Sequence, residues 1–274
     1  MSRLRAEGLV VGYDDRIIID DLDIAIPDAQ ITTIIGPNGC GKSTLLRCLA
    51  RLLPAKAGTV FLDDQDIATI RPKTVARTLG LLPQNPVAPE GLTVADLVSR
   101  GRHPHQRWYQ QASSEDEAAV ERALELTGTA ELAERPVDAL SGGQRQRVWI
   151  ALTLAQETDL LLLDEPTTYL DLAHSVEVLD LVHELKSEHG KTIVMVLHDL
   201  NLATRYSDSL FVMRDGAIVR HGSPESVIDV ELLEQAFGLR SHIIPDPLFG
   251  HPLIVPVGSR GDLRLPEEIP DAAH

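Results

Sequence analysis

The stretch GPNGCGKST at positions 36–44 constrains the fold of this chain more than any other segment. It matches the pattern G-x-x-x-x-G-K-[ST], follows the apolar run ITTII and begins the helical pattern KSTLLRCLARLL. In that context the glycines let backbone N–H groups close around phosphates, and the helix N-terminus adds its partial positive charge. We therefore predict an α/β fold whose phosphate-binding loop joins a buried strand to a helix.

The residues of this loop have distinct expected roles. Lys42 is expected to reach the β- and γ-phosphates of a nucleotide, and the Ser43 hydroxyl to bind Mg²⁺. Cys40 stands at an unconstrained position of the pattern and is expected to be a small buried thiol. A flexible loop that matches by chance is the alternative, which the flanking strand and helix make improbable. The predicted phosphate-binding residues are Gly36, Pro37, Asn38, Gly39, Cys40, Gly41, Lys42, Ser43 and Thr44.

The composition of the chain limits the classes of function that it can have. The 274 residues are 43% hydrophobic, enough for a large core, and the formal net charge of −16 argues against general affinity for nucleic acid or anionic lipid. Cys40 and Cys48 lack the spacing of a zinc site and suit a reducing compartment. The first residues lack the apolar core of a signal peptide, and no apolar run is long enough to span a membrane.

Apolar runs alternate with helical patterns along most of the chain. Runs without polar alternation between helices predict a parallel sheet covered on both faces. The segment SLFVMRDGAIVRHG predicts a hairpin at Asp215 and Gly216. The other predicted strands are LVVGY, RIIID, LDIAIP, QITTIIG, TVFLD, LGLLP, LLLLD and KTIVMVLH, with two short ones in the proline-rich segment that begins at 241.

Residues 86–157 are helical in pattern and interrupt this alternation. One helix there is predicted to begin with Ser114 and Glu117 as its capping box, and TAELAE is also expected to be helical. After the insert, LAHSVEVLDLVHELKSEHG predicts a helix whose apolar stripe starts at Leu172. We predict one domain at 1–240 containing the helical subdomain at about 86–157, and a short extension at 241–274 that ends in a frayed acidic tail.

Four polar residues that follow three predicted strands are expected at the carboxyl edge of the sheet, where α/β sites form. In LLLLDEP, Asp164 is predicted to hold Mg²⁺ and Glu165 to polarise an attacking water. His198 ends KTIVMVLH and is predicted to bond the γ-phosphate, and Gln84 ends LGLLPQ and is a candidate ligand to metal and water. Each has a plainer interpretation in isolation, namely a solvated strand end, a histidine satisfied by carbonyls and a turn amide.

With these motifs in order, the chain resembles the ATP-binding cassette (ABC) ATPases, the ATP-hydrolysing subunits of transporters, over essentially its whole length. The resemblance implies the ABC ATPase fold, which has a P-loop NTPase core with a parallel sheet, an N-terminal antiparallel β subdomain and a helical insert. It implies ATP and Mg²⁺ as cofactors, catalytic roles for Glu165, His198 and Gln84, and metal binding by Ser43, Gln84 and Asp164. It further implies that Tyr13 stacks on adenine and that Asp171 lies in a loop contacting a second subunit.

The segment LSGGQRQR at 140–147 is a poor helix start, because two glycines and two arginines stand in the first turn. Ser141 and Gln144 are nevertheless predicted to form a capping box. The resemblance identifies LSGGQ as the family signature, which faces the phosphate loop of a second copy. Its predicted nucleotide-binding residues are Ser141, Gly142, Gly143 and Gln144. Alanine at either glycine is expected to hold that nucleotide away. Arg145 and Arg147 are expected either to lie near phosphate or to extend into solvent, and the second is favoured.

Five further segments resemble the ATPases of iron–siderophore importers and their cobalamin-importing relatives. They are PTTYLDLAHSVEVL, VLHDLNLATRYSD, DGAIVRHGSPESVI, GRHPHQRW and HIIPDPLFGHPLIVP. The resemblance implies uptake of ferric siderophore, with cobalamin or haem as alternative cargo. It implies transmembrane permease subunits, a second copy of this chain and, indirectly, a periplasmic or lipoprotein substrate-binding protein as partners. It places the chain peripherally on the cytoplasmic face of the inner membrane.

Two other functional classes compete with transport. A soluble ABC ATPase acting on nucleic acid or ribosomes typically has a long coiled coil or two cassettes, and this chain has neither pattern. A non-hydrolysing regulatory cassette is disfavoured because Lys42, Asp164, Glu165 and His198 are all present. His103 and His105 are a thin ligand set, so we expect their segment to help dock the permease rather than bind metal.

Overall fold

The computed structural model describes residues 2–106 and 113–258. Its centre is a six-stranded sheet in the order β10-β9-β3-β8-β7-β6, in which all neighbours are parallel except the β9–β10 hairpin. This confirms the predicted parallel sheet. The strands are β3 (Ile31–Ile35), β6 (Leu79–Leu82), β7 (Leu160–Asp164), β8 (Thr192–Val196), β9 (Ser209–Arg214) and β10 (Ala217–Gly222).

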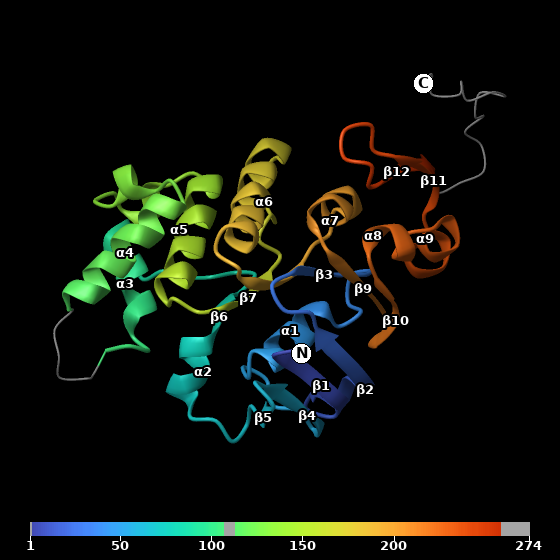
Figure 1. Ribbon diagram of the computed structural model, residues 1–274, viewed down its shortest axis with the longest axis horizontal. Helices are drawn as coiled ribbons and strands as arrows, with labels where there is room; N and C mark the ends of the chain where they lie inside the picture. Colours follow the sequence, from blue (N-terminus) through green and yellow to red (C-terminus); the bar gives the residue numbers. More distant parts are fainter. Residues whose placement is uncertain (1, 107–112, 259–274) are drawn as a thin grey trace.

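A second, antiparallel sheet lies against one face of the first (Figure 1). Its order is β2-β1-β4-β5, and α1 (Lys42–Leu49) lies between the two sheets. The predicted strands RIIID and LDIAIP form one continuous strand, β2, because both halves pair with β1. The strands are β1 (Leu4–Tyr13), β2 (Arg16–Ile26), β4 (Ala57–Leu62) and β5 (Gln65–Asp66).

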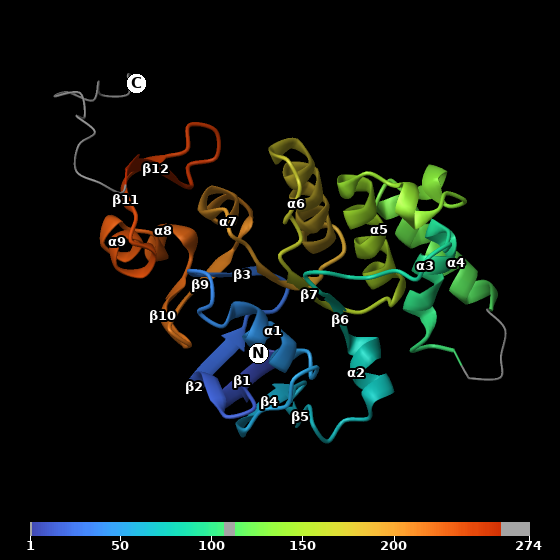
Figure 2. The ribbon, with the colours of Figure 1, turned by 180° about the vertical axis from the view of Figure 1, so that it is seen from behind.

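Helices cover the other face of the central sheet and extend beyond its ends. In Figure 1 the helices between β6 and β7 lie at one end, and the C-terminal hairpin lies at the other; Figure 2 shows the same order from behind. The α-helices besides α1 are α2 (Pro72–Thr78), α3 (Val94–Ser99), α4 (Ser114–Leu126), α5 (Gly142–Ala155), α6 (Leu172–Ser187), α7 (Leu200–Tyr206), α8 (Pro224–Val227) and α9 (Val230–Phe237). The short 3₁₀ segments are Arg100–Arg102, Ala130–Leu132 and Val137–Ala139, and the hairpin is β11 (Arg240–Pro245) with β12 (Pro252–Gly258).

The central strands bury both of their faces, as their unbroken apolar sequences predict. Along β7, Leu161 and Leu163 pack into the helical core, whereas Leu160 and Leu162 pack into the core around α1. Alternate side chains of a strand point to opposite faces, so the same strand contributes to two cores. A sheet buried in this way presents its ends, rather than its faces, to ligands.

Several local predictions need correction. The capping box of α4 is formed by Ser113 and Asp116, one residue earlier than predicted, because Arg102 also bonds Asp116 and fixes it under the helix. The buried stripe of α6 begins at Ser175, and Leu172 is 67% exposed. The segment TAELAE forms only the 3₁₀ turn Ala130–Leu132.

Two other local predictions are confirmed. Asp215 and Gly216 form the turn of the β9–β10 hairpin, both with positive φ as a type I′ turn requires. The C-terminal segment contains two strands as predicted, and the predicted frayed tail lies outside the described residues. Within the described ranges, no helix combines the length and apolarity needed to cross a bilayer.

Candidate functional site

Strand pairing brings the predicted site residues to one edge of the central sheet. Val196 near the end of β8 pairs with Ile34 of β3 on one side and with Asp164 of β7 on the other. The phosphate loop follows β3, Glu165 follows β7 and His198 follows β8, so all three emerge together. On the next strand Leu82 pairs with Leu163, which places Gln84 at the same edge. The parallel register alone therefore assembles the site.

The loop at 36–44 has a backbone that only glycine adopts readily. Gly36 and Gly41 have φ values of 155° and 108°, in the region that side chains disfavour. A Cβ at Gly36 would lie 2.2 Å from the carbonyl oxygen of Met213. The Nζ of Lys42, which is 5% exposed, donates to the carbonyl oxygens of Gly36 (2.8 Å) and Pro37 (3.0 Å). Carbonyls of the loop thus hold the ammonium at the start of α1.

Cys40 is buried in this loop, and burial raises the pKa of its thiol. The thiol is therefore neutral at physiological pH and a poor nucleophile.

Ser43 and Asp164 meet below the loop. The Ser43 hydroxyl donates to Oδ1 of Asp164 at 2.8 Å, while Oδ2 of Asp164 is buried and has no hydrogen-bond partner among the described residues. Burial raises the pKa of Asp164, the bond from Ser43 opposes this, and the nearby charge of Glu165 adds to it. A buried carboxylate oxygen without a partner beside a hydroxyl is a donor set that suits a small divalent cation.

Glu165 is 7% exposed, and its carboxylate accepts hydrogen bonds from three side chains. Gln84 Nε2 lies 2.6 Å and Thr168 Oγ1 2.9 Å from its Oε2, and His198 Nε2 lies 2.6 Å from its Oε1. Burial on its own would raise the pKa of Glu165, but the bonds from Thr168, His198 and Gln84 outweigh it, so the pKa lies below its ordinary value. The carboxylate is consequently ionised at neutral pH despite its burial.

The backbone at Glu165 is strained. Its φ is 55°, in the left-handed region that costs a non-glycine residue about 1–3 kcal/mol. This conformation turns the side chain out of the strand direction and toward Gln84 and His198. Thr168 was missed by the sequence analysis, although its place three residues after Glu165 in DEPTT was a usable signal.

A cavity of about 440 Å³ opens in front of these groups. Its lining includes six of the nine predicted residues of the phosphate loop, together with Tyr13, which ends β1 and is 43% exposed. Arg16 and Ile18 of β2 also line the cavity and were not predicted. The β1–β2 hairpin, in which Arg16 pairs with Tyr13, is the feature from which they could have been predicted. The predicted residues on the lining are Tyr13, Asn38, Gly39, Gly41, Lys42, Ser43, Thr44, Glu165 and His198.

The signature residues do not line this cavity in the part of the chain described. Ser141 begins α5 with the predicted capping box: its hydroxyl accepts from Gln144 N at 3.3 Å, and Gln144 Oε1 accepts from Ser141 N at 3.1 Å. Ser141 and Gly142 are exposed, whereas Gly143 is buried. Asp171 caps α6 and is exposed as well. One chain therefore presents two separate surfaces, the cavity and the start of α5.

An added Cβ at Gly143 would point into its own chain. It would lie 2.6 Å from Cδ2 of His174, and a Cβ at Gly142 would lie 3.8 Å from Leu170. Alanine at Gly143 would therefore also displace a neighbouring ring, and its expected effect on a nucleotide of a second copy stays a prediction.

The two arginines after the signature lie close to their own chain. Arg147 Nη1 is 3.9 Å from Glu177 of α6, and Arg145 Nη2 bonds the carbonyl oxygen of Leu140 at 3.4 Å. The segment that contains His103 and His105 also contacts its own chain, because the ring of His105 bonds the carbonyl oxygen of Gln156 at 2.8 Å. That bond occupies one ring nitrogen of His105, which further disfavours metal binding by this histidine.

The sequence pattern of residues 19–168 matches the family model described as ABC transporter. The match spans more than half of the chain and includes the phosphate loop, the signature and Glu165. The chain belongs to the ABC transporter family, and it is an ATP-binding subunit whose ATPase activity is coupled to transport.

Particular relatives extend this similarity over nearly the whole length. A Bacillus subtilis protein, assigned to a siderophore transport system as its ATP-binding protein, is 55% identical over 94% of each chain. The ferric enterobactin transport ATP-binding protein of Escherichia coli is 51% identical over 94% of this chain and 95% of its own length.

Solved structures confirm the fold. A transporter provisionally assigned to the metal-chelate type, in an inward-facing conformation, superposes with a TM-score of 0.81 at 28% identity, covering 93% of this chain and 97% of that one. A bacterial ABC transporter cassette solved as a dimer gives a TM-score of 0.70 at 27% identity, covering 80% and 98%.

Proposed function

We propose that this chain hydrolyses ATP to power the import of ferric siderophore, acting as a head-to-tail pair of copies beneath a membrane permease. The observation that carries hydrolysis is the ionised, buried Glu165, held by three donors beside the phosphate loop. A loop that only bound nucleotide would gain nothing from such a carboxylate. Phosphate release from ATP by the purified chain, compared with that of Glu165→Gln, tests this proposal.

In the proposed reaction Glu165 accepts a proton from the attacking water, since its lowered pKa keeps it ionised. Gln84 and Thr168 fix Oε2, which leaves the carboxylate one orientation in which to receive that proton. His198 faces a carboxylate through Nε2, so this nitrogen carries a proton. When a γ-phosphate is bound, this N–H would turn from Glu165 to a phosphate oxygen. At 43% side-chain exposure His198 stands on the cavity side of Glu165.

Mg²⁺ fits the pair Ser43 and Asp164, because Oδ2 of Asp164 is buried without a partner in the described chain. When bound there, the ion neutralises charge on the β- and γ-phosphates. Gln84 gives its amide nitrogen to Glu165, which leaves its carbonyl oxygen for the same ion. Lys42 turns from the loop carbonyls that it now bonds to the phosphate oxygens that replace them.

At the other end of the cavity Tyr13 presents its ring for stacking on adenine. Its 43% exposure leaves a ring face available, and Arg16 lies beside it on the paired strand. Stacking of a base on an aromatic ring is typically worth about 1–3 kcal/mol. Tyr13→Ala is accordingly expected to weaken ATP binding without changing the catalytic rate at saturation.

The signature is proposed to complete the site of a second copy. Ser141 is exposed and its hydroxyl accepts the capping bond, so its own proton is available for a phosphate oxygen. The loop ending at Asp171 is exposed next to it, with Tyr169 86% exposed. These exposed segments are the surface that we propose a facing copy covers, and a cassette of similar fold has been solved as a dimer.

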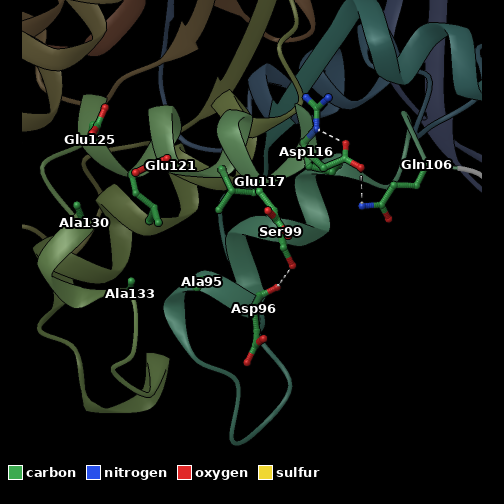
Figure 3. A pocket seen from close by; sticks show the side chains of 13 residues that line it. Ala95, Asp96, Ser99, Gln106, Asp116, Glu117, Glu121, Glu125, Ala130 and Ala133 are labelled. Atoms are coloured by element: carbon green, nitrogen blue, oxygen red, sulfur yellow. Dashed lines mark hydrogen bonds and ion pairs between the residues drawn. The ribbon is translucent and has the colours of Figure 1, made fainter. Parts of the chain in front are cut away.

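A groove between α3 and α4 is proposed to receive the permease (Figure 3). It measures about 480 Å³ and has an apolar floor that includes Val120 and Leu124. Carboxylates from both helices, Asp96, Glu117, Glu121 and Glu125, surround that floor. This lining suits a short amphipathic permease helix with basic side chains. Reversing the charges of Glu121 and Glu125 should reduce stimulation of the ATPase by the permease, whereas Glu184→Lys on α6 should not.

Ferric siderophore is the proposed cargo because relatives at 51–55% identity bear names of siderophore and ferric enterobactin transport. A periplasmic or lipoprotein substrate-binding protein would deliver it to the permease. The proposal places this chain on the cytoplasmic side, where ATP is present. Cobalamin and haem stay weaker alternatives, and uptake assays with each compound separate the three.

A further inference from the structure

The start of α5 lies against the first turn of α6, and the glycines of the signature allow this approach. The two helices run side by side in Figure 1 and in Figure 2. The position of a Cβ at Gly143 would be 2.6 Å from Cδ2, 3.0 Å from Cγ and 3.3 Å from Cβ of His174. The ring of His174 therefore occupies the space that any side chain at position 143 would need.

The same imidazole holds Asp171. Its Nδ1 lies 2.7 Å from Oδ1 of Asp171, and the backbone N–H of His174 donates to the same oxygen at 2.9 Å. Because a carboxylate oxygen accepts, Nδ1 is the protonated nitrogen. One edge of the ring is thus bonded to the Asp171 loop while another packs on Gly143.

Further contacts continue this connection in both directions. One turn along both helices, Arg147 Nη1 lies 3.9 Å from Oε2 of Glu177. Toward the cavity, Thr168 begins the loop that ends at Asp171 and bonds Glu165. The path Glu165, Thr168, Asp171, His174 and Gly143 therefore runs from the proposed base to the start of α5 within one chain.

We propose that His174 is a positioning residue that keeps the Asp171 loop and the start of α5 at one fixed spacing. The inference rests on the proposed function, in which both elements face the nucleotide of a second copy. On this account Gly143 is a glycine because the ring of His174 needs its space. His174 itself contacts no nucleotide, and it acts through Asp171 and Gly143.

The experiment compares four variants of the full chain: Gly143→Ala, His174→Ala, their combination and His174→Asn. Steady-state phosphate release gives kcat and KM, and thermal unfolding gives Tm. His183→Ala on the exposed side of α6 is the matched control. His174→Ala leaves only a Cβ at 3.3 Å from the Cβ of an alanine at 143, which a shift of a few tenths of an ångström relieves.

His174→Ala is expected to lower kcat on the order of tenfold, with KM within about twofold and Tm close to wild type. His174→Asn should recover most of the rate, because its amide can still donate to Asp171. Gly143→Ala should be strongly impaired alone, yet it should cause no further loss in the His174→Ala background.

Equal losses from Gly143→Ala in both backgrounds would overturn the inference, because the glycine would then serve only the facing nucleotide. A wild-type kcat for His174→Ala would overturn it too. Failure of the proposed function is separate: the wild-type chain would not hydrolyse ATP, or Glu165→Gln would hydrolyse it equally fast.

Discussion

Nε2 of His198 lies 2.6 Å from Oε1 of Glu165, although the two residues follow different strands. His198 lies in the loop after β8 and Glu165 follows β7 directly, so the contact depends on the register in which Asp164 pairs with Val196. The bond helps to hold the pKa of a buried carboxyl below its ordinary value. A change at His198 should therefore be visible in the protonation of Glu165.

His198→Ala should move the acidic limb of the kcat profile to higher pH. Glu165 must be ionised to accept a proton, and loss of the His198 bond raises its pKa, so activity is lost at a pH at which the wild type still works. His198→Gln keeps a hydrogen-bond donor to Glu165, so the acidic limb of its kcat profile should lie closer to the pH of the wild-type limb. An unshifted limb in His198→Ala would show that this bond does not set the protonation of Glu165.

Glu165→Gln should bind ATP but turn it over about 10²–10⁴ times more slowly, the usual contribution of a positioned base. Phosphate release measures turnover, and a fluorescent ATP analogue measures binding. Turnover near the wild-type rate would remove Glu165 from the chemistry.

Ser43→Ala should raise the Mg²⁺ concentration required for half-maximal ATPase activity about 10–100-fold, by analogy with other losses at metal sites. The reason is that the Asp164 carboxylate would lose the hydroxyl that lies beside it. Titration of Mg²⁺ after chelation measures this, with Ser187→Ala on α6 as control. An unchanged requirement would place the ion elsewhere.

Asp116→Asn should destabilise the chain by about 3 kcal/mol near neutral pH, because it leaves the buried Arg102 with only Glu157 to neutralise it. Burial opposes ionisation of Asp116, but the bonds from Arg102 and Ser113 outweigh it and lower its pKa from 3.8 to about 2. The contribution of the Asp116–Arg102 ion pair to the free energy of unfolding is therefore complete above about pH 4 and is lost as the pH falls toward 2.

Urea unfolding of both proteins from pH 7 to pH 2 tests this dependence. The difference in free energy of unfolding should shrink only in the acidic range, and Glu115→Gln, in the same helical turn, should show little difference at any pH. A difference that is constant with pH would contradict the assigned ion pair.

The phosphate loop and the edge residues were predictable because they depend on chain order and parallel pairing. A buried strand followed by GPNGCGKST puts Lys42 and Ser43 at the carboxyl end of that strand, independently of the rest of the fold. In the same way, DEP after LLLL puts Asp164 and Glu165 at the end of a neighbouring strand. Gln84 and His198 follow from the same rule, since the carboxyl ends of parallel strands meet at one edge.

Other features were decided by packing that the sequence does not display. The α4 capping box shifted by one residue because Arg102, from another segment, bonds Asp116 rather than Glu117. Leu172 fits the apolar stripe of α6 by spacing but is 67% exposed, because the buried face of α6 begins only at Ser175. The contact of His174 with Gly143 needs the packing of α5 on α6, and neither residue signals it alone.

The composite site formed by two copies is the central claim, and a mixing experiment tests it most directly. Lys42→Ala disables the phosphate loop of one copy, and Ser141→Arg blocks the signature of another, so each variant alone should be inactive. Random mixing of equal amounts should restore about a quarter of the wild-type ATPase rate, because half of the dimers then contain one intact site out of two. A mixture as inactive as the separate variants would contradict the account.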